Sequence, residues 1–164
     1  MDNIIKMVDK NKGEHISVVG DLYRIVISGN ETNGAYAMID MQVPPGGGPP
    51  PHSHSNFHES FLVIDGEVEF KTETGKYTAK KGDFINVPVG GAVHSFKNIS
   101  NKIAHLVCTV VPAGLDEFFK EIGKPVQAGE FLPNKHLNED ELNQLVKIAE
   151  KYGQIIYPIN YLDK

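Results

Sequence analysis

Short apolar runs, each closed by a turn signal, dominate the sequence between Ile16 and Val111 and constrain its fold more than any other feature. The runs are rich in Val, Ile, Phe, Tyr and Thr, the residue types that suit strands. Turn-forming pairs separate them, at Gly29-Asn30, Asn33-Gly34, Asp65-Gly66, Thr74-Gly75, Gly82-Asp83 and Gly90-Gly91. Many short strands joined by tight turns are typical of an antiparallel sandwich or barrel, so we expect an all-β fold.

The apolar runs predict strands at residues 22–28, 35–43, 59–64, 67–72, 76–79, 84–87, 94–98 and 102–111. Segment 67–71 alternates polar and apolar residues, which indicates a strand with one face in solvent. Segment 43–51 holds five prolines and three glycines, so it cannot form regular structure. We interpret it as a stiff loop that leads directly into a pair of histidines.

Helical signals follow the last predicted strand. Segment 115–122 has Asp116 and Glu117 in its first turn and Gly123 after its end, which predicts a short helix. Asn138 and Glu141 form a plausible capping box for a second helix that ends near residue 153. We interpret residues 1–164 as one domain, with a barrel core at about 16–112 and a short helical C-terminal extension at about 113–164.

Composition argues against several classes of partner. The formal net charge is −5 and the basic residues are scattered, so we expect no nucleic-acid partner and no anionic membrane surface. No apolar stretch approaches the roughly 20 residues that span a bilayer, and the N-terminus lacks the features of a signal peptide. The single cysteine, Cys108, lies in an apolar run and predicts a buried, inert thiol. Together these features favour a cytoplasmic protein.

Three histidines and one glutamate have the spacing of metal ligands. His52 and His54 are two residues apart, so on an extended strand both imidazoles leave the same face. Glu59 can join that face only if segment 55–57 turns the chain, and antiparallel hairpins would bring His94 alongside. Three imidazoles and one carboxylate suit Fe, Mn, Co, Ni, Zn or Cu. We therefore predict a site for one divalent transition metal ion, with its identity open.

Segments 46–66 and 82–98 resemble the two motifs of the cupin superfamily. The matching residues are Gly46, His52, His54, Glu59 and Gly66 in the first motif, and Gly82, Pro88, His94 and Asn98 in the second. The second segment carries one extra residue between Pro88 and His94. Segment 27–54 and the C-terminal part, with Phe118-Phe119, are similar to bacterial quercetin-dioxygenase-like cupins. The resemblance implies a small antiparallel jelly-roll β-barrel and assigns the metal ligands to His52, His54, Glu59 and His94.

Other candidate residues receive more modest interpretations. Phe61, Val63 and Phe96 share the strand parity of the ligand residues, so we expect them to point inward as core or substrate-binding side chains. His58 precedes Glu59 and should point to the opposite side of its strand, toward the surface or behind the metal ligands. We expect the remaining histidines to be structural or exposed, at positions 15, 105 and 136.

The leading functional hypothesis is a metal-dependent dioxygenase that acts on a small organic substrate resembling a flavonol or a diketone. By resemblance to quercetinases, Glu59 is expected to serve as a metal ligand and as a catalytic base. Two alternatives stay open: a metal-dependent lyase or isomerase, and a non-enzymatic module that binds or senses a small molecule. Free strand edges also leave a homodimer open.

Overall fold

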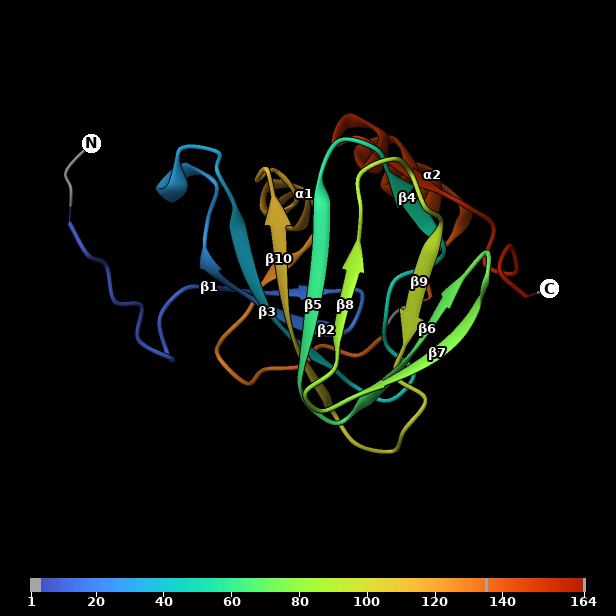
Figure 1. Cartoon of the computed structure of the whole chain (residues 1–164), viewed down its shortest axis with the longest axis horizontal. Helices are drawn as coiled ribbons and strands as arrows, with labels where there is room; N and C mark the ends of the chain where they lie inside the picture. Colours follow the sequence, from blue (N-terminus) through green and yellow to red (C-terminus); the bar gives the residue numbers. More distant parts are fainter. Residues whose placement is uncertain (1–3, 135, 164) are drawn as a thin grey trace.

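The structure is a computed structural model that describes residues 4–134 and 136–163, and it places all the described strands in two facing antiparallel sheets (Figure 1). The larger sheet has seven strands, in the order β11-β1-β2-β3-β10-β5-β8. In that order their bounds are Lys124–Pro125, Glu14–Val18, Asp21–Ile27, Ala37–Val43, Ala104–Val111, His58–Asp65 and Phe84–Val87. β3, β10 and β5 lie side by side at its centre and are the longest-paired part of the molecule.

The smaller sheet has five strands, in the order β12-β4-β9-β6-β7. Their bounds are Gln154–Ile156, His52–His54, His94–Lys97, Glu67–Thr72 and Gly75–Lys80. Within the described residues the two sheets do not merge into one closed hydrogen-bonded barrel, since each keeps its own edge strands. The all-β, jelly-roll fold predicted from the sequence is confirmed, in the form of an open sandwich of two sheets.

Alternation along the central strands builds the core between the sheets. In β3 the side chains of Ala37, Ile39, Met41 and Val43 are buried, and the residues between them are only partly covered. Successive side chains of a strand point to opposite faces, so each of these strands contributes one fully apolar face. This face meets Phe61, Phe70 and Phe96, whose rings lie 5.2–5.4 Å apart.

The eight strands predicted from the apolar runs are present, with ends shifted by one or two residues. The structure adds β4, which the sequence predicted only as an extended segment through His52 and His54, and β1, β11 and β12, which the sequence pattern did not predict. β11 and β12 have two and three residues, too few to show a period, and they exist because neighbouring strands supply their hydrogen-bond partners. β12 also corrects the view that the C-terminal extension is purely helical.

Within the described part of the chain, two α-helices and one short 3-10 helix complete the fold. α1 (Leu115–Ile122) has the predicted bounds and packs the ring of Phe119 edge-on against Tyr23, with centroids 5.0 Å apart. α2 (Glu139–Lys151) begins with the predicted capping box between Asn138 and Glu141. The 3-10 helix η1 spans Asn30–Thr32. Both α-helices lie toward the same end of the sheets (Figure 1, top).

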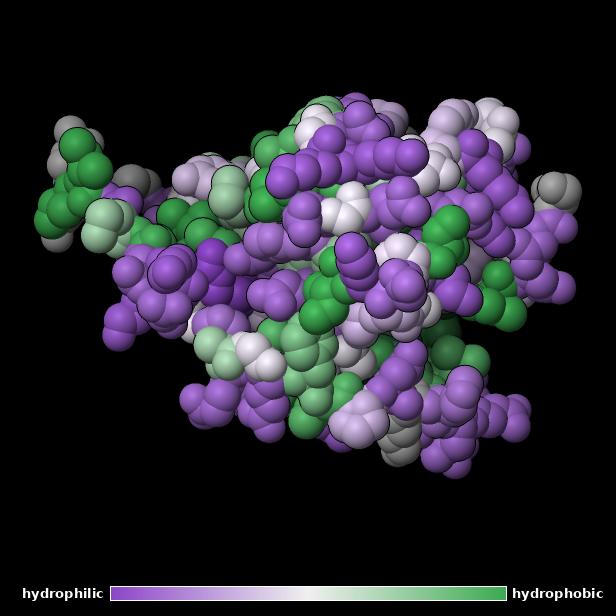
Figure 2. Space-filling view, turned by 90° about the horizontal axis from the view of Figure 1, so that it is seen from below, coloured by the Kyte–Doolittle hydropathy of each residue, from purple (hydrophilic) through white to green (hydrophobic). Residues whose placement is uncertain are grey.

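The described helices include none that is both long and apolar enough to cross a membrane. Seen from below, hydrophilic side chains cover most of the molecule, with single apolar residues between them (Figure 2). Among the exposed apolar side chains, Ile5 and Met7 belong to the N-terminal segment that extends away from the sheets (Figure 1).

Candidate metal centre

β4 positions the first two histidines. The proline-rich loop before it has no regular structure, as the sequence predicted, and delivers the chain to His52 in extended form. His52 and His54 therefore point to the same inner face, and both are buried. Gly48 lets this loop pass directly over the backbone of Phe96, where any side chain at that position would overlap the Phe96 carbonyl oxygen. The loop is thus a fixed wall beside the histidines.

The bend at residues 55–57 brings Glu59 to the histidines, as its odd spacing from His54 required. Phe57 closes this bend: its ring stacks on the His54 imidazole at 4.1 Å, and its carbonyl oxygen lies 3.2 Å from His54 Nδ1. β5 begins immediately after, with Glu59 turned into the interior and 3 % exposed. His94 arrives from β9, whose pairing with β4 sets it directly opposite His52.

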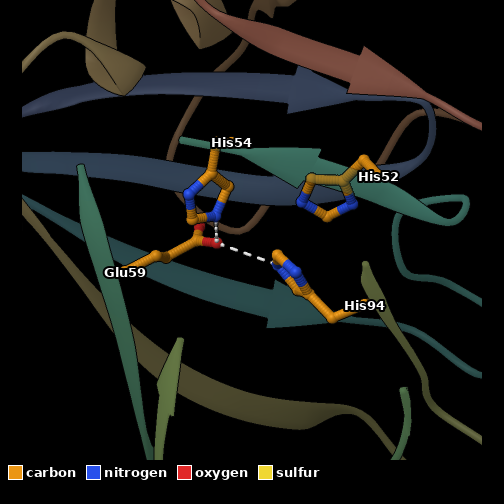
Figure 3. A group of neighbouring side chains, drawn as sticks. All are labelled: His52, His54, Glu59 and His94. Atoms are coloured by element: carbon orange, nitrogen blue, oxygen red, sulfur yellow. Dashed lines mark hydrogen bonds and ion pairs between the residues drawn. The ribbon is translucent and has the colours of Figure 1, made fainter. Parts of the chain in front are cut away.

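These four side chains converge on one point between the sheets (Figure 3). Their nearest candidate ligand atoms all lie within 4.8 Å of one another. Glu59 Oε2 is 3.1 Å from His54 Nε2 and 3.3 Å from His94 Nε2. All four residues are at least nine-tenths buried, so the structure places together every residue that the sequence proposed as a metal ligand.

The hydrogen bond made by Nδ1 of each histidine fixes the tautomer of its ring. Nδ1 of His52 lies 2.9 Å from the Pro50 carbonyl oxygen, and Nδ1 of His94 lies 2.9 Å from that of Ala92. A carbonyl oxygen only accepts hydrogen bonds, so Nδ1 must carry the proton and Nε2 presents a lone pair. The same holds for His54 at Phe57. Lone pairs of nitrogen then face a carboxylate oxygen at about 3 Å, an arrangement that a bound cation satisfies.

The surroundings of His52 and Glu59 shift the pKa values of these two residues in the direction that favours metal binding. Burial lowers the pKa of His52 to about 4, with the neighbouring His94 adding to the effect, so its imidazole is neutral at neutral pH. Burial raises the pKa of Glu59, but positive charge on the side of His54, His94 and His52, whether on the imidazoles or on a cation bound by their Nε2 atoms, outweighs burial and holds that pKa below its usual range. A neutral imidazole and an ionised carboxylate are the forms that bind metal.

Cys108 contacts the centre, which the sequence pattern did not indicate. Its thiol is fully buried in β10 and donates to Glu59 Oε1 at 3.4 Å. Burial, followed by the charge of Glu59 and this hydrogen bond, raises the pKa of the thiol, so it stays protonated. The pairing of β10 with β5 brings the two residues together across the sheet, and that register is not readable from the local sequence. The thiol is buried, as predicted, and it also orients the carboxylate.

A cavity of about 180 Å³ adjoins the cluster, and His52 and Glu59 form part of its wall. Phe61 and Phe96, two of the residues predicted to contact substrate, also line it. Val63 is buried in the core and lies outside the described lining of this cavity. The remaining wall includes side chains of the C-terminal extension that the sequence did not assign to a site: Leu115, Phe118, Phe119, Ile122, Leu137, Leu142, Leu145, Gln154 and Ile156.

The other histidines lie outside the cluster. His58 is exposed on the outer side of β5, as its parity predicted. His105 pairs with Asp40 on the outer face of the large sheet. His15 is half-buried in β1 and His136 is exposed. A larger, more open cleft of about 610 Å³ runs between β7 and β8 and reaches the cluster only at His94.

A jelly roll with a buried set of three histidines and one glutamate defines the class of this protein. Residues 39–110 match the family model described as a cupin domain. The chain is also 25% identical over 121 residues to quercetin 2,3-dioxygenase of Bacillus subtilis (strain 168). The aligned region covers 74% of this chain and 35% of the relative. Residues 39–110 therefore form a cupin domain. The chain matches about a third of the length of that curated relative.

Solved structures with the same fold carry several different activities. A sugar phosphate isomerase from Silicibacter pomeroyi superposes with a TM-score of 0.60 at 16% identity, over 66% of this chain and 77% of that one. A polyketide cyclase from Streptomyces resistomycificus superposes with a TM-score of 0.58 at 18% identity, over 84% of this chain and 90% of that one. Similarity at this level establishes the fold, while activity has to be argued from the site.

Proposed function

We propose that this cupin is a metal-dependent dioxygenase, with one divalent transition metal ion held by His52, His54, Glu59 and His94, and that its substrate is small, largely apolar and diketone-like. The observation that carries the proposal is the position of the cluster: His52 and Glu59 form part of the wall of an apolar cavity. When bound, a metal ion supplies Lewis acidity and, for Fe, Mn, Co, Ni or Cu, redox capacity toward dioxygen.

The size of the cavity favours a small substrate. Pockets for drug-sized ligands measure about 300–1,000 Å³, and this cavity holds about 180 Å³. Of the two substrate types considered from the sequence, a short diketone fits this volume better than a three-ring flavonol.

The chemistry of the wall favours a neutral substrate. Among the described residues, the cavity lining contains no lysine and no arginine, and most of the lining is aliphatic or aromatic. Recognition of a phosphate or carboxylate usually employs such cations. A sugar phosphate, the substrate class of one structural relative, would find no basic side chain in this lining. The lining therefore supports an oxygenase substrate over a phosphorylated one.

The residues around the cavity would have two roles: some exclude water, and Glu59 accepts a proton. Phe61, Phe96 and Phe118 exclude water from the cavity, which protects reactive intermediates from hydrolysis. Glu59 borders the cavity and would accept the proton of an enol bound there. The low pKa of Glu59 makes it a ligand first, so the proton-accepting role requires looser contacts with His54 and His94 when substrate is present.

Oxygen uptake tests the proposal. The purified chain should contain near-stoichiometric metal and consume dioxygen with 2,4-pentanedione faster than with quercetin. Glu59→Gln should lower the rate by at least about a hundredfold, whereas His58→Gln, the adjacent exposed histidine, should leave it unchanged. Metal without oxygen uptake on either substrate would shift the assignment to a lyase or isomerase. A chain that stays metal-free after reconstitution would overturn the metal centre itself.

A further inference from the structure

The cavity beside the metal centre contains two buried polar atoms without a partner. In the part of the chain that the structure describes, Asp21 Oδ1 and Gln154 Nε2 are the two buried side-chain atoms that lack a hydrogen bond. Each residue is 4 % exposed, and both lie on the wall of the same cavity. An unpaired buried polar atom costs about 1–3 kcal/mol, so two of them facing one space call for an explanation.

Asp21 is held in place by its other oxygen. It begins β2, and its Oδ2 accepts a hydrogen bond from the Tyr23 hydroxyl at 3.2 Å. Gly47 provides the room for the carboxyl group, since a side chain at position 47 would overlap Asp21 Oδ1. Burial raises the pKa of Asp21 to about 7, an effect that Tyr23 and the Gly48 amide only partly offset. The structure thus keeps Oδ1 desolvated and fixed beside the cavity.

The position of Gln154 on β12 places its side chain on the wall of the same cavity. It begins β12, and the register of β12 with β4 sets it directly opposite His54. Residues directly opposite each other on paired antiparallel strands point to the same face. Because His54 points inward, the Gln154 side chain does so too and ends on the cavity wall with its Nε2 donor unused.

Asp21 Oδ1 can accept a hydrogen bond and Gln154 Nε2 can donate one, so a ligand would need a donor for the first atom and an acceptor for the second. A ligand group must donate to Asp21 Oδ1 and accept from Gln154 Nε2, and a hydroxyl does both. An ammonium group cannot accept from Gln154, and among the described residues no lysine or arginine lines the cavity to bind an anion at this point. We propose that Asp21 and Gln154 form a polar recognition subsite for a hydroxyl group of a small, otherwise apolar substrate. This inference rests on the proposed function in one respect: it takes this cavity as the substrate site.

Phenol and toluene test the subsite without turnover, because they have nearly the same size and differ by a hydroxyl in place of a methyl group. Isothermal titration calorimetry on the full chain, as purified and again with chelator, should show phenol binding at least about tenfold more tightly than toluene. Gln154→Leu and Asp21→Leu should each remove most of this preference while toluene affinity holds or rises. Ile155→Ala, an exposed neighbour on β12, is the matched control and should behave as wild type.

The outcomes separate this inference from the dioxygenase proposal. A preference for phenol that is equal in wild type and both variants, or that disappears with chelator, would overturn the subsite. Absence of binding of both probes at millimolar concentration would overturn it as well, since the cavity would then admit no ligand or only water. Thermal unfolding of each variant checks its fold, and Gln154→Leu carries the test if Asp21→Leu does not fold. None of these readouts depends on oxygen consumption, so either proposal can fail alone.

Discussion

The Nδ1 atom of His94 lies 2.9 Å from the carbonyl oxygen of Ala92, two residues earlier in the chain. His52 repeats the arrangement with Pro50, and His54 uses Phe57 on its C-terminal side. In each case a local backbone carbonyl, supplied by the loop next to the histidine, accepts a hydrogen bond from the Nδ1–H group. The loops around β4 and β9 therefore decide which nitrogen is free to bind a metal.

This arrangement predicts the tautomer of all three histidines in the metal-loaded protein. With Zn²⁺ bound, long-range ¹H–¹⁵N correlation spectra should show a protonated Nδ1 and a metal-bound Nε2 for His52, His54 and His94. His94→Ala should lower the affinity for Zn²⁺ by at least about a hundredfold. An Nε2-protonated form of any of the three histidines in the loaded protein would contradict the assignment.

Cys108 is predicted to tune the metal affinity through Glu59. Cys108→Ala removes the donor to Glu59 Oε1 without adding bulk, which should weaken metal binding by about tenfold. Cys108→Ser retains a donor and should stay within about threefold of wild type. Competition with a chromogenic chelator measures both affinities. Equal affinities for the two variants would show that the thiol only fills space.

The metal cluster could be predicted from the sequence because it depends on local features, namely the spacing of neighbouring residues and the positions of turns. The two-residue spacing of His52 and His54 fixes a shared face, and the hairpins around His94 follow from turn residues. The same reasoning predicted α1 and the capping box of α2, since both depend on residues within one turn of the helix end.

The rest of the site depends on register and packing, which local patterns do not encode. Cys108 contacts Glu59 because β10 pairs with β5. Gln154 faces inward because the short strand β12, which follows α2, pairs with β4. Asp21 contacts the cavity because a glycine far along the chain leaves room for it. Val63 has the right parity but lies too deep in the core to line the cavity, since parity gives a face and not a depth.

The pair of His105 and Asp40 on the outer face of the large sheet predicts a pH-dependent stability. Its hydrogen bond with Asp40 raises the pKa of His105, so this contribution is complete below pH 6.5 and is lost as the pH rises through the raised value. Burial raises the pKa of Asp40, but His105 and Arg24 outweigh it and lower the pKa, so its contribution is complete above pH 3.8. The pair should therefore stabilise the fold most between these two values.

A double-mutant cycle measures this contribution directly. The coupling energy between His105→Gln and Asp40→Asn, from urea unfolding, should be clearly favourable near pH 5.5 and close to zero near pH 9.5. Wild type and His105→Gln should accordingly differ more in Tm at the lower pH. A coupling energy that is the same at both pH values would mean that the pair contributes as a neutral hydrogen bond.

Phe118 is predicted to limit the size of the ligand that the cavity accepts. Its ring is 5 % exposed, lies on the cavity wall and packs against Tyr152, with centroids 5.9 Å apart. Phe118→Ala should cost about 3 kcal/mol in the free energy of unfolding, near the lower end for such substitutions because the ring already borders open space. The same substitution at Phe84, which is 64 % exposed, should cost less than about 0.5 kcal/mol.

Because the volume that the Phe118 ring leaves empty joins the cavity, naphthalene should bind Phe118→Ala measurably in calorimetric titrations and wild type only weakly. Equal naphthalene affinity in both proteins would show that α1 moves in to fill the space, and that the C-terminal extension is a mobile cover and not a fixed wall.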